Sequence, residues 1–246
     1  MNLLTSLLSL SVVGVQAAGS WSGTSMQGCL ISTPDILPVP PSSIVDMSRA
    51  PIPVRTNLWI PIPRWLAGTW EADTQAYISC FEYKTRSSLI DQPVLISIRR
   101  ISTRGLQIDA LGQIWQHVDA PCLSMVEKTH YAEGSLLLDT QVIDSSPNSL
   151  TLRSRARVTR ADKSTLKLID EFFEETTTVY KRVRDGVIEV TFIVDDYDAD
   201  GSPRTSSKSV SLELRIKPFQ VVNRDQSGDL RRAFNEFQRN KQMAQP

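Results

Sequence analysis

The sequence predicts an all-β protein whose globular part is an antiparallel, up-and-down β-barrel of about eight to ten strands, followed by a C-terminal helix. Three observations support this fold class. Apolar and polar residues alternate over a series of short segments between residues 69 and 222, turn residues separate these segments, and no helical pattern lies between them. Short connections favour antiparallel neighbours, and closing such a sheet into a barrel removes its exposed edges.

The composition is that of a globular protein. Of the 246 residues, 41% are hydrophobic and 22% are charged, which supplies enough apolar material for a core. Lys plus Arg equals Asp plus Glu at 27 each, so the chain has no overall field to attract nucleic acid or anionic lipid. Arg153, Arg155 and Arg157 share one face of a predicted strand and could form a local basic patch. We favour a solvated outer sheet face for them.

The N-terminus has the features of a signal peptide over residues 1–18. Leu3 to Val15 form an apolar run that is long enough for a signal-peptide core and too short to cross a bilayer. Ala17 and Ala18 supply the small residues that a signal peptidase needs. A buried first strand is the alternative. We expect export to a periplasm, a thylakoid lumen or the extracellular space, and we expect no transmembrane segment in the mature chain.

A proline-rich, extended leader is predicted over residues 19–60, because its repeated prolines interrupt any helix or central strand. Apolar residues such as Trp59 and Ile60 indicate that part of this leader lies across the barrel or plugs one of its ends. We expect the β-barrel over residues 61–222 and a C-terminal helix with a short tail over residues 223–246.

The clearest strands come late in the chain. Two runs of apolar residues at alternate positions mark them, namely Ile188, Val190, Phe192 and Val194, and then Val210, Leu212, Leu214 and Ile216. Asp185-Gly186 precedes the first of these runs and follows another strand-like run. Asp-Gly between two such runs is a strong hairpin signal, so a hairpin is predicted there.

The only convincing helix is the last element. Asp229 can cap its N-terminus, and Leu230, Phe234 and Phe237 then fall on one face of the helix. We expect this apolar stripe to pack against the outside of the barrel. A helix that binds a partner protein is the alternative.

Residues 63–71 read Pro-Arg-Trp-Leu-Ala-Gly-Thr-Trp-Glu just where the strands begin. This segment resembles the start of a lipocalin or related calycin barrel, in which a short helical turn delivers Gly-x-Trp to the first strand. Gly68 allows a tight approach of the turn, and Trp70 can cover the closed end of the barrel. The resemblance implies an arginine near the last strand beside this tryptophan, and Arg215 and Arg224 are both available. The segment is also similar to lipocalin-like proteins of cyanobacteria and plastids.

No catalytic residue, cofactor or metal is predicted. Neither His117 nor His130 lies in a recognisable nucleophile motif, and the chain has no phosphate-binding loop. The alternating carboxylates of Asp196, Asp198 and Asp200 resemble the first ligand positions of a calcium-binding loop. The final glutamate of such a loop is missing, so we favour a solvated hairpin tip.

The three cysteines, Cys29, Cys80 and Cys122, cannot all pair within one chain. A Cys80–Cys122 disulfide and buried free thiols both remain open.

The expected function is ligand binding, by a barrel that encloses a small hydrophobic molecule such as a lipid or a pigment. The alternative is a non-enzymatic assembly or maintenance factor, which would act through protein–protein contacts of a solidly packed barrel in a photosynthetic membrane system. An enzyme ranks last. The residues expected to line or plug the barrel and to contact the ligand are Trp70, Tyr77, Trp115, Phe173, Phe192 and Leu214.

Overall fold

The computed structural model describes residues 56–120, 122–128, 130–165, 167–225 and 228–243. The predicted signal peptide, most of the predicted leader and Cys29 lie outside the described residues. In chain order the elements are β1 (Thr56–Ile62), η2 (Arg64–Leu66), β2 (Gly68–Glu82), β3 (Ser87–Ser88), β4 (Val94–Arg104), β5 (Gln107–Ile108), β6 (Ile114–Ala120), β7 (Cys122–Glu127), β8 (Tyr131–Ser146), β9 (Ser149–Asp162), β10 (Leu168–Arg184), β11 (Val187–Tyr197), β12 (Pro203–Lys217), β13 (Arg224–Asp225), β14 (Gly228–Asp229) and α1 (Leu230–Met243).

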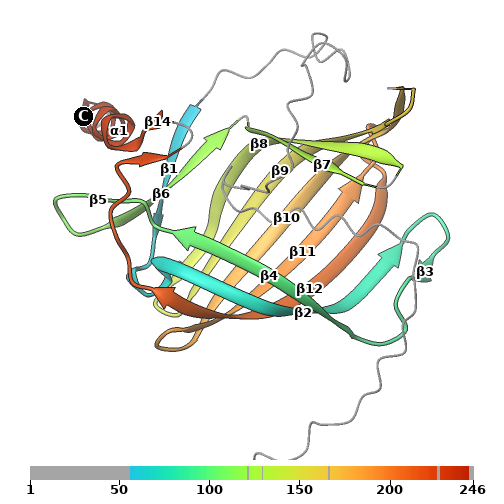
Figure 1. The fold of residues 1–246 in the computed structure, drawn as a ribbon, viewed down its shortest axis with the longest axis horizontal. Coiled ribbons are helices and arrows are strands. Elements are labelled where there is room, and N and C mark those ends of the chain that lie inside the picture. Colours follow the sequence, from blue (N-terminus) through green and yellow to red (C-terminus); the bar gives the residue numbers. More distant parts are fainter. Residues whose placement is uncertain (1–55, 121, 129, 166, 226–227, 244–246) are drawn as a thin grey trace, which may run out of the picture.

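A curled antiparallel sheet forms a half-barrel and dominates the fold (Figure 1). Its strand order is β3-β2-β12-β11-β10-β9-β8-β7, and β4 pairs with β2. The mainly antiparallel β architecture with a C-terminal helix confirms the predicted fold class. Within the described residues no pairing joins β4 to β7, so the closed barrel and its number of strands stay predictions.

Turn chemistry explains why β10 and β11 form a hairpin. Gly186 has a φ of 70°, a conformation that L residues with side chains rarely adopt, and Arg184 pairs with Val187 across the turn. The hairpin predicted at Asp185-Gly186 is confirmed. After a register irregularity between Arg182 and Arg184, the two strands pair residue by residue as far as Phe173 and Tyr197.

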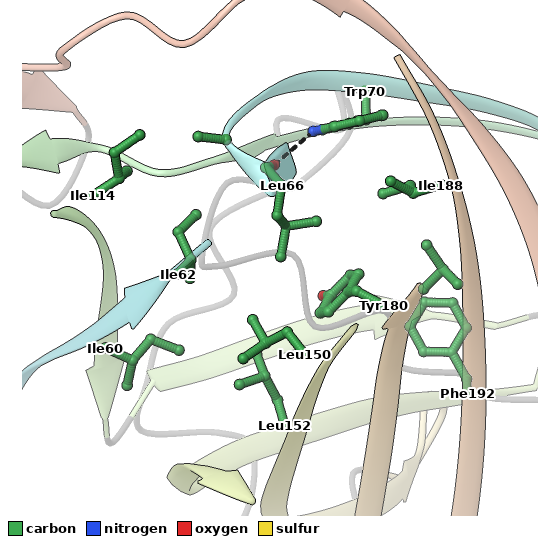
Figure 2. Close-up of a cluster of buried hydrophobic side chains, with 12 residues drawn as sticks. Ile60, Ile62, Leu66, Trp70, Ile114, Leu150, Leu152, Tyr180, Ile188 and Phe192 are labelled. Atoms are coloured by element: carbon green, nitrogen blue, oxygen red, sulfur yellow. Dashed lines mark hydrogen bonds between the residues drawn. The ribbon is translucent and has the colours of Figure 1, made fainter. Parts of the chain in front are cut away.

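Alternation along the long strands gives the sheet one buried and one exposed face. On β9, for example, Leu150, Leu152 and Ser154 are buried while Arg155 is exposed. Apolar residues of the concave face pack with residues of η2 and of the strands β1 and β6 in the core cluster shown in Figure 2, whose members are Ile60, Ile62, Leu66, Ala67, Trp70, Ile114, Leu150, Leu152, Tyr180, Ile188, Val190 and Phe192. Each large member contributes about 1.5–3 kcal/mol by leaving water.

A second, smaller sheet of order β1-β6-β5 lies beside the half-barrel and carries α1. Residues 56–60 of the predicted leader belong to its strand β1, in which Trp59 and Ile60 are buried. Trp59 packs with Leu230 and Phe234 of the helix in a second cluster.

The C-terminal helix begins where the sequence predicts. The Asp229 carboxylate accepts a hydrogen bond from the backbone N–H of Arg232 at 2.9 Å, which satisfies one of the free donors of the first turn. The helix packs against the small sheet and β13 rather than against the wall of the curled sheet. None of the described helices is long and apolar enough to cross a membrane.

Candidate functional site

Buried side chains of β2, β4 and the strands from β8 to β12 lie on the concave face of the half-barrel. It is apolar at the end near η2 and becomes polar in its middle. Three buried residues of β12 face the concave side, namely Ser209, Ser211 and Glu213, and each pairs with a buried apolar residue of β11. This mixed lining is the candidate binding surface of the protein.

The apolar end is closed by η2 and by Trp70, which is completely buried. The indole nitrogen of Trp70 donates a hydrogen bond to the carbonyl of Leu66 at 2.9 Å (Figure 2). The Arg215 guanidinium lies 4.7 Å from the centre of the Trp70 ring and donates to the carbonyl of Trp65. Of the two arginines considered from the sequence, Arg215 is therefore the one beside the tryptophan.

Gly68 makes this closure sterically feasible. Its φ is 135°, and a Cβ at this position would lie 2.7 Å from the carbonyl oxygen of Lys217. Only glycine combines that backbone conformation with so close an approach of β12. The interpretation of Gly68 and Trp70 as a compact end closure agrees with this geometry.

A buried charged triad crosses the concave face next to the apolar cluster. Glu213, with 1% of its side chain exposed, accepts hydrogen bonds from Arg100 at 2.9 Å and from Arg104 at 2.7 Å. Burial alone would raise the pKa of Glu213, but the charges and hydrogen bonds of Arg104 and Arg100 outweigh burial and lower it. The carboxylate is therefore held in its charged form.

Both arginines of the triad lie on aromatic rings of the facing strands. The guanidinium of Arg100 is 4.9 Å from the ring centre of Phe192, and that of Arg104 is 4.8 Å from the ring centre of Tyr180. Arg100 also donates to Ser211 at 2.7 Å and to Gln75 at 3.2 Å. Side chains of β4 thus contact residues of β2, β12, β11 and β10 on the concave side of the sheet.

Three buried polar atoms beside the triad have no hydrogen-bond partner among the described residues. They are the hydroxyl oxygens of Ser102 and Thr178 and the Nε of Arg100. Ser102 lies between the two arginines on β4, and Thr178 pairs with Phe192, the residue beneath Arg100. Buried polar groups are nearly always satisfied, so these atoms are positions where a bound molecule or solvent would donate or accept.

A second charged cluster lies at the other end of β10. The ring of Phe172 lies between the guanidinium groups of Arg160 and Arg204, at 4.7 and 4.8 Å. Asp170 binds Arg204 at 2.8 Å and lies 3.6 Å from Arg160. Burial would raise the pKa of Asp170, but Arg204 and Arg160 lower it, whereas burial raises the pKa of the nearby Asp196.

Three of the six predicted lining residues lie on the concave face. Trp70 and Phe192 belong to its apolar cluster. Tyr77 pairs with the buried Ser209, and its pKa is raised by burial despite the opposing charge of Arg100. Arg100 lies on the ring of Phe192 and acts on Tyr77, whereas Trp70 lies beneath Arg215.

Two predicted lining residues face outward and correct the sequence interpretation. Phe173 is 38% exposed, and the interior position belongs to its neighbour Phe172 at 1%. Leu214 is 53% exposed, and the interior position belongs to Glu213. Neighbouring strand residues point to opposite faces, so a one-residue error moves a side chain from the interior to the surface.

Trp115 is buried but does not line the half-barrel, which is a third correction. It lies on β6 in the second cluster, with Leu106, Leu230 and Phe234. Its indole nitrogen donates to the Asp109 carboxylate at 2.9 Å. The pairing of β6 with β1 and β5 places it in the small sheet.

The remaining sequence candidates have structural explanations. Arg155 is exposed on the outer face and binds Glu175 at 2.9 Å, in line with the solvated face that we favoured. Asp196, Asp198 and Asp200 bind Thr205, Arg204 and the backbone of Ser202 at the hairpin tip. In the described part of the chain, no group of three or more His, Cys, Asp or Glu side chains is arranged to hold a metal ion.

Cys80 is a buried free thiol. Its pKa is raised to about 11 by burial and by the nearby charges of Asp196 and Glu82. The Cys80–Cys122 disulfide considered from the sequence is therefore not formed.

The charged triad was missed by sequence reasoning. Arg100, Ser102 and Arg104 alternate along β4, and this spacing in the sequence is a signal that they share a face. Nothing local shows that this face is the inner one, because its partner Glu213 comes more than a hundred residues later. No protein-family model, no curated protein and no solved structure matches this chain. The site must therefore be interpreted from its own chemistry.

Proposed function

We propose that this protein binds a small, mainly hydrophobic molecule on the concave face of the half-barrel, and that the molecule carries a neutral hydrogen-bonding group such as a hydroxyl or a carbonyl. The observation that carries the proposal is the group of unpartnered polar atoms of Ser102, Thr178 and Arg100. Ser102 pairs with Trp70 and Thr178 with Phe192 of the apolar cluster, and Arg100 belongs to the charged triad. A ligand with an apolar body and one polar group would complement both parts.

The charged triad favours a ligand with a neutral polar group over a ligand with an acidic group. Glu213 already supplies a carboxylate to both Arg100 and Arg104. An anionic ligand would have to displace this buried carboxylate, which would then lie unpaired at a high cost in free energy. A hydroxyl or carbonyl can instead bond to the free Ser102 and Thr178 hydroxyls without disturbing the ion pairs.

The rest of the proposal concerns the molecule as a whole. A complete lipocalin-like barrel of about eight to ten strands would enclose the ligand more fully than the half-barrel, and closure remains part of the proposal. Export to a periplasm, a thylakoid lumen or the extracellular space is supported by the N-terminal apolar run alone. We propose no enzymatic activity, because no nucleophile motif accompanies the charged groups.

Native mass spectrometry of the protein purified from its own compartment tests the proposal directly. A stoichiometric small molecule that is released on denaturation would support it and give the chemical class of the ligand. Titration with Nile red, an uncharged apolar dye with a carbonyl group, provides a second readout by fluorescence. We expect saturable binding at one site per chain.

Matched variants test where the dye binds. Val194 faces the concave side, between the buried Phe192 and Asp196, and its neighbour Ile193 faces outward. Val194→Trp should weaken Nile red binding by about tenfold or more by filling the site, and Ile193→Trp should leave binding unchanged. Ser207→Phe, directly across from Val194, gives a second test if the first variant is unstable. Equal binding by all folded variants would refute the proposed site.

One observation favours the second candidate function, a protein-assembly or maintenance factor. The outer face of β12 carries Leu212, Leu214 and Ile216, and all three are exposed. Exposed apolar stripes of this kind are typical of protein contacts. The second function is supported instead if no small molecule is found and a polypeptide co-purifies stoichiometrically with the wild type. That polypeptide should then be lost with the Leu212→Ser/Leu214→Ser variant.

A further inference from the structure

A groove of about 1010 Å³ lies at the C-terminal helix. One wall is formed by residues of α1, and the other by residues of β5, of β13 and of the loops beside them. Ile108, Ala110 and Val221 form its apolar part. Its charged lining residues are Arg224, Arg231, Arg232, Arg239, Asp109 and Asp229.

The four arginines outnumber the two carboxylates, and both carboxylates are already engaged. Asp109 accepts hydrogen bonds from the Trp115 indole and from the backbone of Leu111 and Gln113, at 2.9 to 3.0 Å. Burial would raise the pKa of Asp109, but these hydrogen bonds lower it and keep it charged. Asp229 caps α1 through the Arg232 backbone. Both carboxylates keep their charge, so the four arginines against two carboxylates leave the lining of the groove with a net positive charge.

The guanidinium groups themselves are only partly engaged by the described residues. Arg231 donates to the amide oxygen of Gln107 at 3.0 Å, and Arg239 donates to the carbonyl of Asn235 at 3.4 Å. Arg224 lies 3.9 Å from Asp229, and Arg232 binds Glu236 at 3.1 Å. Each guanidinium carries five N–H donors, so most donors along the groove face solvent.

Phosphate groups match this arrangement best. The planar fork of arginine binds two phosphate oxygens at once, which is why arginines cluster where phosphates are recognised. A carboxylate offers one such pair of oxygens, whereas a ligand with two or more phosphates can contact several of the four arginines. The groove is as large as the sites that hold small molecules.

We propose that this groove binds a molecule that carries at least two phosphate groups, either a free phosphorylated metabolite or the multiply phosphorylated headgroup of a lipid. Arg224 and Arg239 contact the phosphates from opposite walls, and Arg231, held by the buried Gln107, orients them. The small apolar part of the groove contacts the carbon skeleton. This inference is independent of the proposed function of the half-barrel.

The test uses the whole mature protein and two probes. Inositol hexakisphosphate represents a free ligand and is titrated calorimetrically at physiological ionic strength. Vesicles of phosphatidylcholine, with and without a phosphatidylinositol bisphosphate, represent the lipid source and are assayed by co-sedimentation. The variant is Arg224→Ala/Arg239→Ala, and the control is Arg182→Ala/Arg184→Ala, which removes two exposed arginines at the β10–β11 hairpin.

Saturable binding of inositol hexakisphosphate that falls about tenfold or more in the groove variant, but not in the control, supports a free phosphorylated ligand. The same pattern with bisphosphate vesicles alone supports a lipid headgroup. The proposal is overturned if neither probe binds saturably to the wild type, or if both double variants weaken binding equally. The last result would mean that only net charge matters.

Discussion

Replacing Glu213 with glutamine would show what the buried triad contributes to stability. Glutamine keeps the shape of the side chain and removes its charge, so Arg100 and Arg104, which lie on the same face of β4, would lose the carboxylate that both of them bind. Both contacts are shorter than 3 Å, and the Glu213 side chain is 1% exposed, so solvent cannot compensate. Removing one partner of such a buried ion pair costs about 3–5 kcal/mol.

Urea unfolding at pH 7 measures this loss. For a protein of this size the urea dependence of the unfolding free energy is about 2–3 kcal/mol per molar, so the midpoint should fall by about 1–2 M. The matched control is Glu71→Gln. Glu71 pairs with the outward-facing Leu214, and its replacement should change the unfolding free energy by less than about 0.5 kcal/mol.

The pH dependence provides a second check on Glu213. Its pKa is lowered in the folded state, so its stabilising effect is complete above the pKa of the unfolded chain, about 4.3. The effect is lost as the pH falls through the lower folded-state pKa. The wild type and Glu213→Gln should therefore converge in stability below about pH 4. If the difference in unfolding free energy between the wild type and Glu213→Gln is small at pH 7, or does not decrease in acid, the triad does not stabilise the fold in the way that we infer.

Three further predictions concern single positions. Gly68→Ala should lower the free energy of unfolding by about 3 kcal/mol or more, because the new Cβ adds a clash to an unfavourable backbone conformation. Gly201→Ala, which has open space around it, should lower the free energy of unfolding by about 1 kcal/mol, and thermal unfolding compares the two variants. Cys80 should react with iodoacetamide at pH 8 far more slowly in the native protein than in urea, since its thiol is buried and its pKa is about 11, and fast native labelling would contradict this. Phe172→Ala should lower the free energy of unfolding by about 3–5 kcal/mol, and Phe173→Ala by less than about 1 kcal/mol. Similar losses for the two variants in denaturant unfolding would contradict the inward position of Phe172 and the outward position of Phe173.

The end closure at Trp70 could be predicted because its determinants are local. Leu66, Gly68 and Trp70 lie within five residues, and the hydrogen bond from Trp70 to Leu66 spans a single turn. The helix cap at Asp229 is local in the same sense. Such features follow from backbone geometry that the neighbouring residues largely determine.

The position of Trp115 could not be predicted because it depends on a distant pairing. β6 pairs with β1, and the partner of Trp115 in that ladder is Pro61. An aromatic residue within a strand-like run shows that the residue is buried, but it does not show in which of two sheets. Only the pairing of segments far apart in the sequence separates the small sheet from the half-barrel.

In strand β12 the sequence correctly predicts alternating residues, but the face that we assigned to the interior is the outer one. Alternation defines two faces, and the usual rule assigns the apolar one, here containing Leu212 and Leu214, to the core. The interior face instead carries Ser209, Ser211 and Glu213, because these residues pair with the arginines and Gln75 that enter from β2 and β4. The reversal therefore depends on charges supplied by strands more than a hundred residues away.

The reversal of β12 also links the two candidate functions to one structural cause. A polar interior restricts the ligand to molecules that can satisfy Ser102 and Thr178, and the same alternation forces the leucines of β12 onto the surface. A strand that only completed a packed core would place its leucines inward, where burial contributes about 1.5–3 kcal/mol for each. The fold loses this stabilisation at Leu212 and Leu214. Such a loss is explained if the polar interior, the apolar exterior or both bind another molecule. The concave face is the stronger candidate of the two, because its unpartnered polar atoms are buried, whereas the outer face offers exposed leucines alone.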